Sequence, residues 1–310
     1  MGFLQVVPFA WIEKWGSYCL AFATVLLWLV FVPGLYRKVG GAARWLHVAG
    51  ISFQPVEIAK LSLLLFLAKT LSLHTTIEKP LPTLLRILLP LILVGIPLMA
   101  QPDFGNCAIL VASTFLFIFV SGVSRKLLLY ATGGAGLFAC IAIFSSAYRT
   151  KRILVFLNPW DHFQTGGFQI IQSYLGFQNG GLFGVGLGES RQKLFFLPEA
   201  HNDFILSVIG EESGFLGFLA ICLLFLYVIH CGFSIMRQQE NLFRKYVAFG
   251  ITTTFAIQGI FNFFVVTGLL PTKGISLPLI SSGVSSLLSS VLMVGILLRL
   301  SKETEERKFR

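Results

Sequence analysis

The sequence predicts an all-α polytopic membrane protein, and three observations support this fold class. Of its 310 residues, 55% are hydrophobic and only 12% are charged, about half the charged share of an ordinary soluble domain. The mean hydropathy of +0.80 is too high for a surface that faces water. Long unbroken apolar stretches such as 84–100 exclude an outer-membrane barrel, whose strands alternate apolar and polar residues. Helices then remain as the structure that satisfies every backbone group in lipid.

Apolar runs long enough to cross a bilayer, which takes about 20 residues, predict eight spans. In chain order the spans are 17–35, 55–74, 84–101, 105–122, 128–146, 204–230, 247–270 and 279–299. A shorter apolar segment, 3–11, is expected to be the last half of one further helix. The whole chain, 1–310, is expected to form a single membrane domain of about eight and a half helices.

The distribution of Lys and Arg predicts a cytoplasmic C-terminus. With that orientation, 14 of the 24 basic residues lie inside and ten lie outside, within a net charge of +10. Ten cations on the translocated side oppose the insertion bias, so they require another explanation. They either pair with acids on the same side or bind an anionic substrate such as a lipid-linked phosphate.

One predicted outer loop, 147–202, is roughly 56 residues long, whereas loops beyond about 12–15 residues are usually functional or disordered. Its many aromatic residues argue against disorder. We expect amphipathic helices and turns that pack on the membrane surface. The spacing of its glycines at 180–188 matches neither the Gly-x-Gly-x-x-Gly pattern nor the Walker pattern of nucleotide-binding loops. A tight turn is therefore the preferred interpretation.

Ionisable residues at membrane depth are expensive and mark functional sites by default. Glu57 and Lys60 lie one turn apart at the start of the 55–74 span, so they share a face and can pair. Both a structural ion pair and a cavity-lining role remain open. Asp103 lies in a tight turn before a helix; it is expected to be an N-cap, and a cavity role could coexist with that.

Asp203 directly precedes the apolar run that begins at Phe204. It is either an N-cap or a reactive acid, because Glu199 and His201 converge beside the same helix entry. Such clustering tunes carboxylate pKa values for base catalysis. Near the C-terminus, prolines and glycines between 271 and 283 prevent a continuous helix, and irregular backbone at membrane depth implies a covered cavity wall.

Together these segments resemble the SEDS family of bacterial cell-wall polymerases over essentially the whole chain. The matching runs are Ser-Phe-Gln-Pro-Val-Glu-Ile-Ala-Lys at 52–60, Gln-Pro-Asp-Phe-Gly at 101–105, Asn-Pro-Trp at 158–160, Lys-Leu-Phe-Phe-Leu-Pro-Glu-Ala-His-Asn-Asp-Phe-Ile at 193–205, Pro-Thr-Lys-Gly at 271–274 and Leu-Pro-Leu-Ile-Ser at 277–281. Ala200 and the 271–274 turn are similar to the members of the family that act in cell division.

The resemblance implies a ten-helix bundle with both termini in the cytoplasm of a bacterium, in its inner membrane at the division site. It implies polymerisation of lipid II into glycan strands on the outer face, with a class b penicillin-binding protein transpeptidase and other division proteins as partners. The family's essential aspartate falls on Asp203, its cavity acid-base pair on Glu57 and Lys60, and a further acidic cavity residue on Asp103. There are three departures from the family pattern. The 281–285 run stands where Ser-Tyr-Gly-Gly-Ser is common, Asn202 stands where Thr is usual, and the first family helix and most of the second are absent.

On this basis we expect an inverting glycosyltransferase in which Asp203 deprotonates the acceptor 4-hydroxyl. Charge on the pyrophosphate leaving group can be stabilised by four cations, Lys60, Arg152, Lys193 or Lys273. A divalent cation, Mg²⁺ or Mn²⁺, could share that role beside Asp203 or Glu199. We group Glu57, Asp103, Glu199 and His201 with these cations as substrate-binding residues. No nucleotide, organic cofactor or nucleic-acid partner is expected.

Two rival hypotheses come from other functional classes. A lipid II flippase predicts charged residues along a path through both leaflets, whereas the cytoplasmic half of the predicted spans is nearly free of acids. A non-catalytic division scaffold predicts that changing Asp203 is harmless. The combination of Asp203 with Glu57, Lys60 and Asp103 favours the enzyme.

Overall fold

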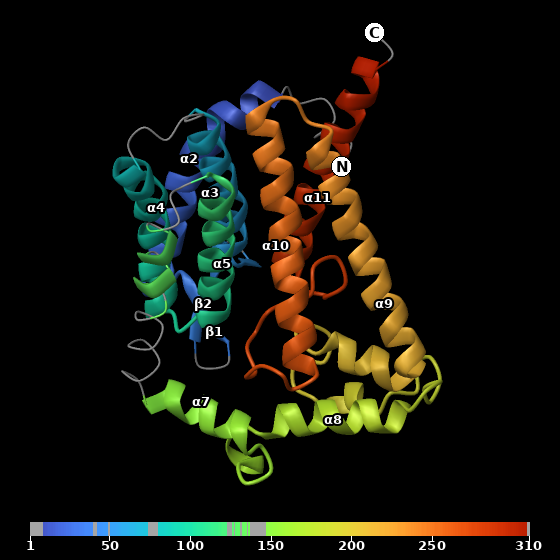
Figure 1. Cartoon of the computed structure of the whole chain (residues 1–310). Coiled ribbons are helices and arrows are strands. Elements are labelled where there is room, and N and C mark those ends of the chain that lie inside the picture. Colours follow the sequence, from blue (N-terminus) through green and yellow to red (C-terminus); the bar gives the residue numbers. More distant parts are fainter. Residues whose placement is uncertain are drawn as a thin grey trace. The chain divides into compact units, whose positions relative to one another are not determined.

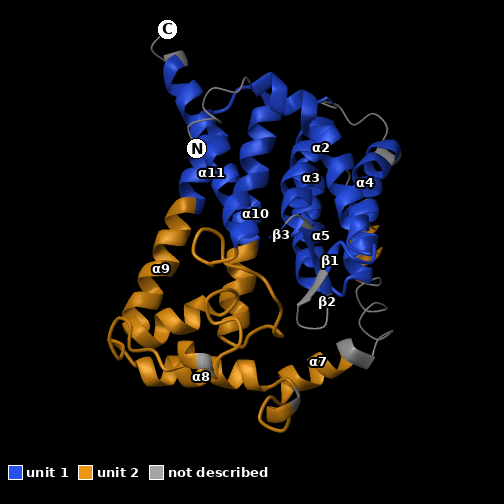
Figure 2. Ribbon diagram, turned by 180° about the vertical axis from the view of Figure 1, so that it is seen from behind, with its two compact units in different colours: residues 1–128, 229–257, 284–310 blue, residues 129–228, 258–283 orange. Residues whose placement is uncertain are grey.

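A computed structural model describes residues 9–39, 42–48, 50–73, 80–122, 126, 128–130, 132–134, 136 and 147–308. The chain divides into two compact units, coloured in Figure 2. Unit 1 comprises residues 1–128, 229–257 and 284–310, and unit 2 comprises residues 129–228 and 258–283. Helices α9 (Ile205–Arg237) and α10 (Leu242–Val266) each contribute to both units. The expectation of a single membrane domain stays a prediction.

Unit 1 is a helical bundle. Besides parts of α9 and α10 it contains α2 (Phe9–Leu29), α3 (Pro55–Ser72), α4 (Pro80–Ala100), α5 (Phe104–Val120) and α11 (Val284–Lys308). Figure 1 shows α2, α3, α4 and α5 side by side, and α3 contacts α2, α4, α5 and α11. Among its fully buried apolar side chains are Leu27, Leu63, Leu67, Ile87, Leu98, Ile109 and Phe117.

A small antiparallel sheet follows α2 in unit 1 and is the main departure from an all-α fold. Strands β1 (Tyr36–Val39), β2 (Ala42–Val48) and β3 (Ile51–Phe53) pair in that order, with Leu46 opposite Phe53. The sequence Gly40-Gly41 between the first two strands is a dipeptide typical of hairpin turns. The sheet lies between the predicted spans 17–35 and 55–74, in a stretch for which the sequence interpretation assigned no secondary structure.

Unit 2 contains the loop expected between the spans. Its elements are α7 (Ala147–Leu157), the 3₁₀ turn η1 (Phe163–Thr165), α8 (Phe168–Gly180) and the π-helical turn η2 (Gln192–Phe196). Figure 1 shows α8 running crosswise at the end of α9. The two helices approach closely, because a Cβ on Gly180 would lie 2.0 Å from the Gly210 carbonyl oxygen. The prediction of ordered helices and turns in 147–202 is confirmed.

Four helices among the described residues are long and apolar enough to cross a membrane: Pro82–Ala100, Ile205–Arg237, Leu242–Val266 and Val284–Glu306. Helix α5 is apolar but only 17 residues long. The prediction of a helical membrane protein is therefore confirmed. The predicted span 128–146 lies mostly outside the described residues. The prediction of a separate helix ending at Trp11 is wrong, because α2 continues without a break from Phe9 to Leu29.

Candidate active site

The first predicted group of site residues begins α3 in unit 1. Pro55 occupies the first turn of this helix, where its missing N–H has no helical partner to lose. Lys60 Nζ donates a hydrogen bond to Glu57 Oε1 at 2.7 Å, and the two side chains are only 2% and 7% exposed. The predicted pairing is confirmed. A role for the pair in substrate binding stays a prediction.

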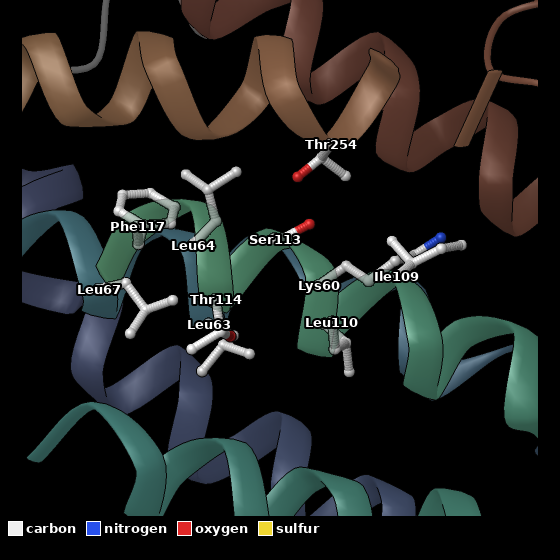
Figure 3. Close-up of a pocket in the computed structure, with 10 residues that line it drawn as sticks. All are labelled: Lys60, Leu63, Leu64, Leu67, Ile109, Leu110, Ser113, Thr114, Phe117 and Thr254. Atoms are coloured by element: carbon white, nitrogen blue, oxygen red, sulfur yellow. The ribbon is translucent and has the colours of Figure 1, made fainter. Parts of the chain in front are cut away.

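A small cavity of about 10 Å³ lies beside the Lys60 side chain in unit 1. Figure 3 shows Lys60, Ser113, Thr114 and Thr254 among the residues that line it. The hydroxyls of Ser113 and Thr114 are buried and find no hydrogen-bond partner in the part of the chain that the structure describes. The space is about that of one water molecule. It is therefore too small for a sugar or a lipid.

Asp103 is the N-cap of α5, as predicted. Its Oδ1 accepts from the Asn106 backbone N–H at 3.4 Å and its Oδ2 accepts from the Asn106 side chain at 2.9 Å. Arg44 on β2 secures the same turn by donating to the Pro102 carbonyl at 2.8 Å and, at 3.4 Å, to the Gln101 carbonyl. Both oxygens of this buried carboxylate thus serve the helix start. A cavity role for Asp103 stays a prediction.

The second predicted group lies in unit 2, in the turn that leads into α9. Asp203 is half-buried, whereas Glu199 and His201 are exposed. The backbone closes tightly, because Asn202 N–H and Phe204 N–H both donate to the Glu199 carbonyl, at 3.0 and 3.3 Å. Asn202 also donates from its side chain to Glu199 Oε2 at 2.6 Å. Glu199, His201 and Asp203 thus lie in one tight turn at the helix entry. Joint action of their side chains stays a prediction.

A buried asparagine on α10 holds the backbone of Asp203. Asn262 Nδ2 donates to the Asp203 carbonyl at 2.8 Å and to the Ile275 carbonyl at 2.7 Å. The Asn262 side chain is 1% exposed. One amide group thus joins the catalytic candidate to the irregular segment 271–283, both within unit 2.

Two serines of that segment form hydrogen bonds with the backbone of the turn that contains Asp203. Ser281 Oγ donates to the Asn202 carbonyl at 2.7 Å and also accepts from the Leu277 N–H at 2.8 Å. Ser282 donates to the His201 carbonyl from its backbone N–H at 3.0 Å. The irregular backbone predicted for 271–283 is therefore present, and its hydrogen bonds attach it to the turn. Its role as a cavity wall stays a prediction.

The four candidate cations differ in their surroundings. Arg152 Nη1 donates to the Thr272 carbonyl at 2.8 Å, which places the guanidinium beside the backbone of half-buried Lys273. Lys193 instead forms an ion pair with Glu212 at 2.8 Å and also donates to the Gly188 carbonyl. Its charge is thus already compensated by the protein. Lys60 belongs to unit 1 and is paired as described above.

Asn262 is a site residue that the sequence interpretation missed. It is a single amide within the aromatic run Phe261-Asn262-Phe263-Phe264. A polar residue isolated inside an apolar span is a signal that could have identified it.

Metal ligands do not form a ready-made cluster in this part of the fold. Among the described residues, no three or more His, Cys, Asp or Glu side chains gather to hold a metal ion. The turn contains two carboxylates, those of Asp203 and Glu199, and the latter accepts a hydrogen bond from Asn202. They can supply one or two oxygen ligands, the number that Mg²⁺ commonly takes from a protein when phosphates provide the rest.

The apolar helices, the buried ion pair and the acidic turn held by buried polar groups define a polytopic membrane protein with a carboxylate site. The chain belongs to the family of cell cycle proteins that includes FtsW, RodA and SpoVE, whose family model matches residues 1–306.

Curated relatives and solved structures agree with this membership. A relative from Geobacter sp. strain M18, named "Probable peptidoglycan glycosyltransferase FtsW", is 41% identical over 309 residues, which cover 97% of this chain and 82% of the relative. A relative of the same name from Coxiella burnetii is 39% identical, covering 96% and 82%.

Two solved structures share the fold. One is described as "Structural coordination of polymerization and crosslinking by a peptidoglycan synthase complex" and matches with a TM-score of 0.79 and 25% identity, covering 97% of this chain and 85% of that one. The other is the crystal structure of the rod shape determining protein RodA from Thermus thermophilus, with a TM-score of 0.69 and 26% identity over 97% and 82%.

Proposed function

We propose that this protein is a peptidoglycan glycosyltransferase that polymerises lipid II at the outer face of the bacterial inner membrane during cell division. The observation that carries the proposal is the turn 199–204, which presents the Asp203 carboxylate while Asn262 and Ser281 hold its backbone. A residue whose backbone is held in this way suits proton transfer, because a base must stay within hydrogen-bond reach of the proton it removes. The names of the relatives at about 40% identity support the same activity.

In the proposed reaction the acceptor sugar's 4-hydroxyl attacks the anomeric carbon of the donor. Asp203 takes the hydroxyl proton, a new C–O bond forms, and the bond from that carbon to the lipid pyrophosphate breaks. Attack from the face opposite the leaving group inverts the anomeric centre. Arg152 and Lys273 are the cations of unit 2 that we place near the departing pyrophosphate, since charge developing there is stabilised by fixed positive groups.

A divalent cation fits this scheme as a further proposal. Asp203 or Glu199 would supply a carboxylate ligand to Mg²⁺ or Mn²⁺, and the ion would supply additional positive charge for the leaving group. We further propose that the protein works with a class b penicillin-binding protein transpeptidase. The solved synthase complex, in which polymerisation and crosslinking are coordinated, supports such a partner.

The test uses the full chain reconstituted in liposomes with fluorescent lipid II, alone and with its partner transpeptidase. Wild-type protein should form glycan ladders on a gel, and Asp203→Asn should form none while keeping the wild-type unfolding midpoint. Asp161→Asn is the matched control, because Asp161 is an exposed acid of the same unit. Ladders of wild-type intensity from Asp203→Asn would refute the proposal. Lipid II transport across the bilayer without ladders would favour the flippase.

A further inference from the structure

Helix α9 is interrupted where it meets a glycine-rich loop. Gly214 adopts φ 67° and ψ −167° inside α9, so the helical backbone pattern breaks around it. The carbonyls of Glu211 and Glu212, just before the break, accept hydrogen bonds from Val185 N–H at 3.0 Å and Gly186 N–H at 3.1 Å. These donors belong to residues 181–188, which we call the glycine loop.

The residues just after the break bind the same loop. Phe215 N–H donates to the Gly181 carbonyl at 2.8 Å, and Leu216 N–H donates to the Leu182 carbonyl at 3.2 Å. Four backbone hydrogen bonds therefore join the loop to the interruption from both sides. The glycine loop lies alongside residues 211–216 of a helix that is long and apolar enough to cross a membrane.

Glycine is required for this close approach. A Cβ on Gly184 would lie 2.1 Å from the Glu212 carbonyl oxygen, and a Cβ on Gly214 would lie 2.5 Å from the Gly184 nitrogen. Gly184 also has a φ of 83°, which disfavours other residues. The loop is thus built to be docked on α9 and not to extend into solvent.

The side chains of the glycine loop point away from α9. Leu182, Phe183 and Leu187 are 61%, 79% and 86% exposed. On α9 at the same level, Phe215 and Leu216 are 53% and 51% exposed. Exposed apolar side chains are thus found both on the outer surface of the spanning helix and on the glycine loop docked against it.

The two acidic side chains at this level have partners within the protein. Glu211 is 1% exposed and accepts from Ser190 Oγ at 2.5 Å and from Gln192 N–H at 3.1 Å. Glu212 is paired with Lys193 at 2.8 Å. Lipid-exposed irregular backbone does not occur within the hydrocarbon core of a bilayer. The glycine loop, which pairs with α9 through four backbone hydrogen bonds, therefore belongs at the interfacial edge of the bilayer, where water reaches the remaining backbone groups.

We infer that the glycine loop is a lipid-contacting anchor that inserts Leu182, Phe183 and Leu187 into the edge of the bilayer. The lipid surface is the occupant of this apolar patch because the patch is continuous with the exposed flank of α9. The anchor fixes the level at which the chain emerges toward η2 and the turn that bears Asp203. This inference does not depend on the proposed enzymatic activity.

The test measures the depth of spin labels in the full chain reconstituted in liposomes. The five native cysteines are first replaced by alanine, and labels are then attached to Phe183→Cys or Leu187→Cys. Leu223→Cys on the 58%-exposed flank of α9 serves as the lipid reference. Glu189→Cys, at an exposed acid next to the glycine loop, serves as the water reference.

Labels at 183 and 187 should collide more often with oxygen than with a water-soluble nickel chelate, as the label at 223 does. A nickel accessibility equal to that at 189 would overturn the inference. Low accessibility to both reagents would also overturn it, because protein from a second copy would then cover the patch. A second test needs no substitution. A lipid-soluble diazirine should label residues 182–187 of the unmodified chain, and a water-soluble diazirine should not.

Discussion

The substitution Asn262→Leu tests whether the position of Asp203 matters for activity, because it leaves the Asp203 carboxylate itself unchanged. Leucine has nearly the shape of asparagine but lacks both the Nδ2 donors and the Oδ1 acceptor. In the native protein Nδ2 satisfies two carbonyls, those of Asp203 and Ile275. Oδ1 is buried and has no hydrogen-bond partner among the described residues. The variant therefore removes two hydrogen bonds and one unsatisfied oxygen.

The expected loss of stability follows from this count. Each buried carbonyl left unpaired costs about 1–3 kcal/mol, and removing the unpaired Oδ1 returns about 1–3 kcal/mol. The net destabilisation should be about 1–3 kcal/mol. The loss of activity should be larger, about 100-fold in kcat, because a displacement of about 1 Å of a catalytic group has that effect.

Both quantities are measured on purified protein: the unfolding midpoint in detergent, and the rate of glycan formation at saturating lipid II. Gln178→Leu is the control, since Gln178 is an exposed amide on α8 in the same unit. The reasoning is refuted if Asn262→Leu keeps the wild-type kcat. It is also refuted if kcat falls only as far as the folded fraction does.

Three further predictions concern the charged groups. Lys60→Met should lower the free energy of unfolding by about 3–5 kcal/mol, because it leaves the buried Glu57 carboxylate without its ion-pair partner. Adding Glu57→Gln should restore most of that loss in the same unfolding assay. A double variant as unstable as the single one would contradict this. Asp103→Ala should lose about 0.5–2 kcal/mol of helix-cap stability while Asp103→Asn retains it, so equal losses would exclude the cap. Lys193→Ala should lower the free energy of unfolding by no more than about 1 kcal/mol, because the Lys193–Glu212 ion pair is partly exposed. It should leave the rate of polymerisation within about threefold of wild type, because the Lys193 ammonium is already paired with Glu212. A much larger fall in kcat would show that Lys193 contacts substrate.

Local sequence signals predicted the parts of the fold that depend on near neighbours. Pro55 marked the start of α3 correctly, since proline is well accommodated in the first helical turn, where its missing N–H costs no helical hydrogen bond. The three-residue spacing of Glu57 and Lys60 was enough to predict their ion pair, and Asp103 was recognised as a cap from its place before an apolar run. In each of these cases the partner lies within one helical turn.

Contacts between distant residues could not be predicted in the same way. Lys193 and Glu212 are 19 positions apart, and Asn262 and Asp203 are 59 apart, so no periodicity connects them. The sheet around Leu46 was missed because the strands are short and follow directly on an apolar helix. The interruption of α9 at Gly214 was missed as well, because a glycine inside a helical pattern is usually tolerated and the partners of the interruption lie about 30 positions away, in residues 181–186.

The central claim is that Asp203 acts as the base in glycan polymerisation, and the turnover of Asp203→Asn tests it most directly. Initial rates of lipid II consumption should be measured across lipid II concentrations in the reconstituted system, beside wild type and Asp161→Asn. Because general-base catalysis contributes about 10²–10⁴-fold, kcat should fall by at least about 100-fold with KM little changed. A kcat equal to that of the two comparison proteins would contradict the account.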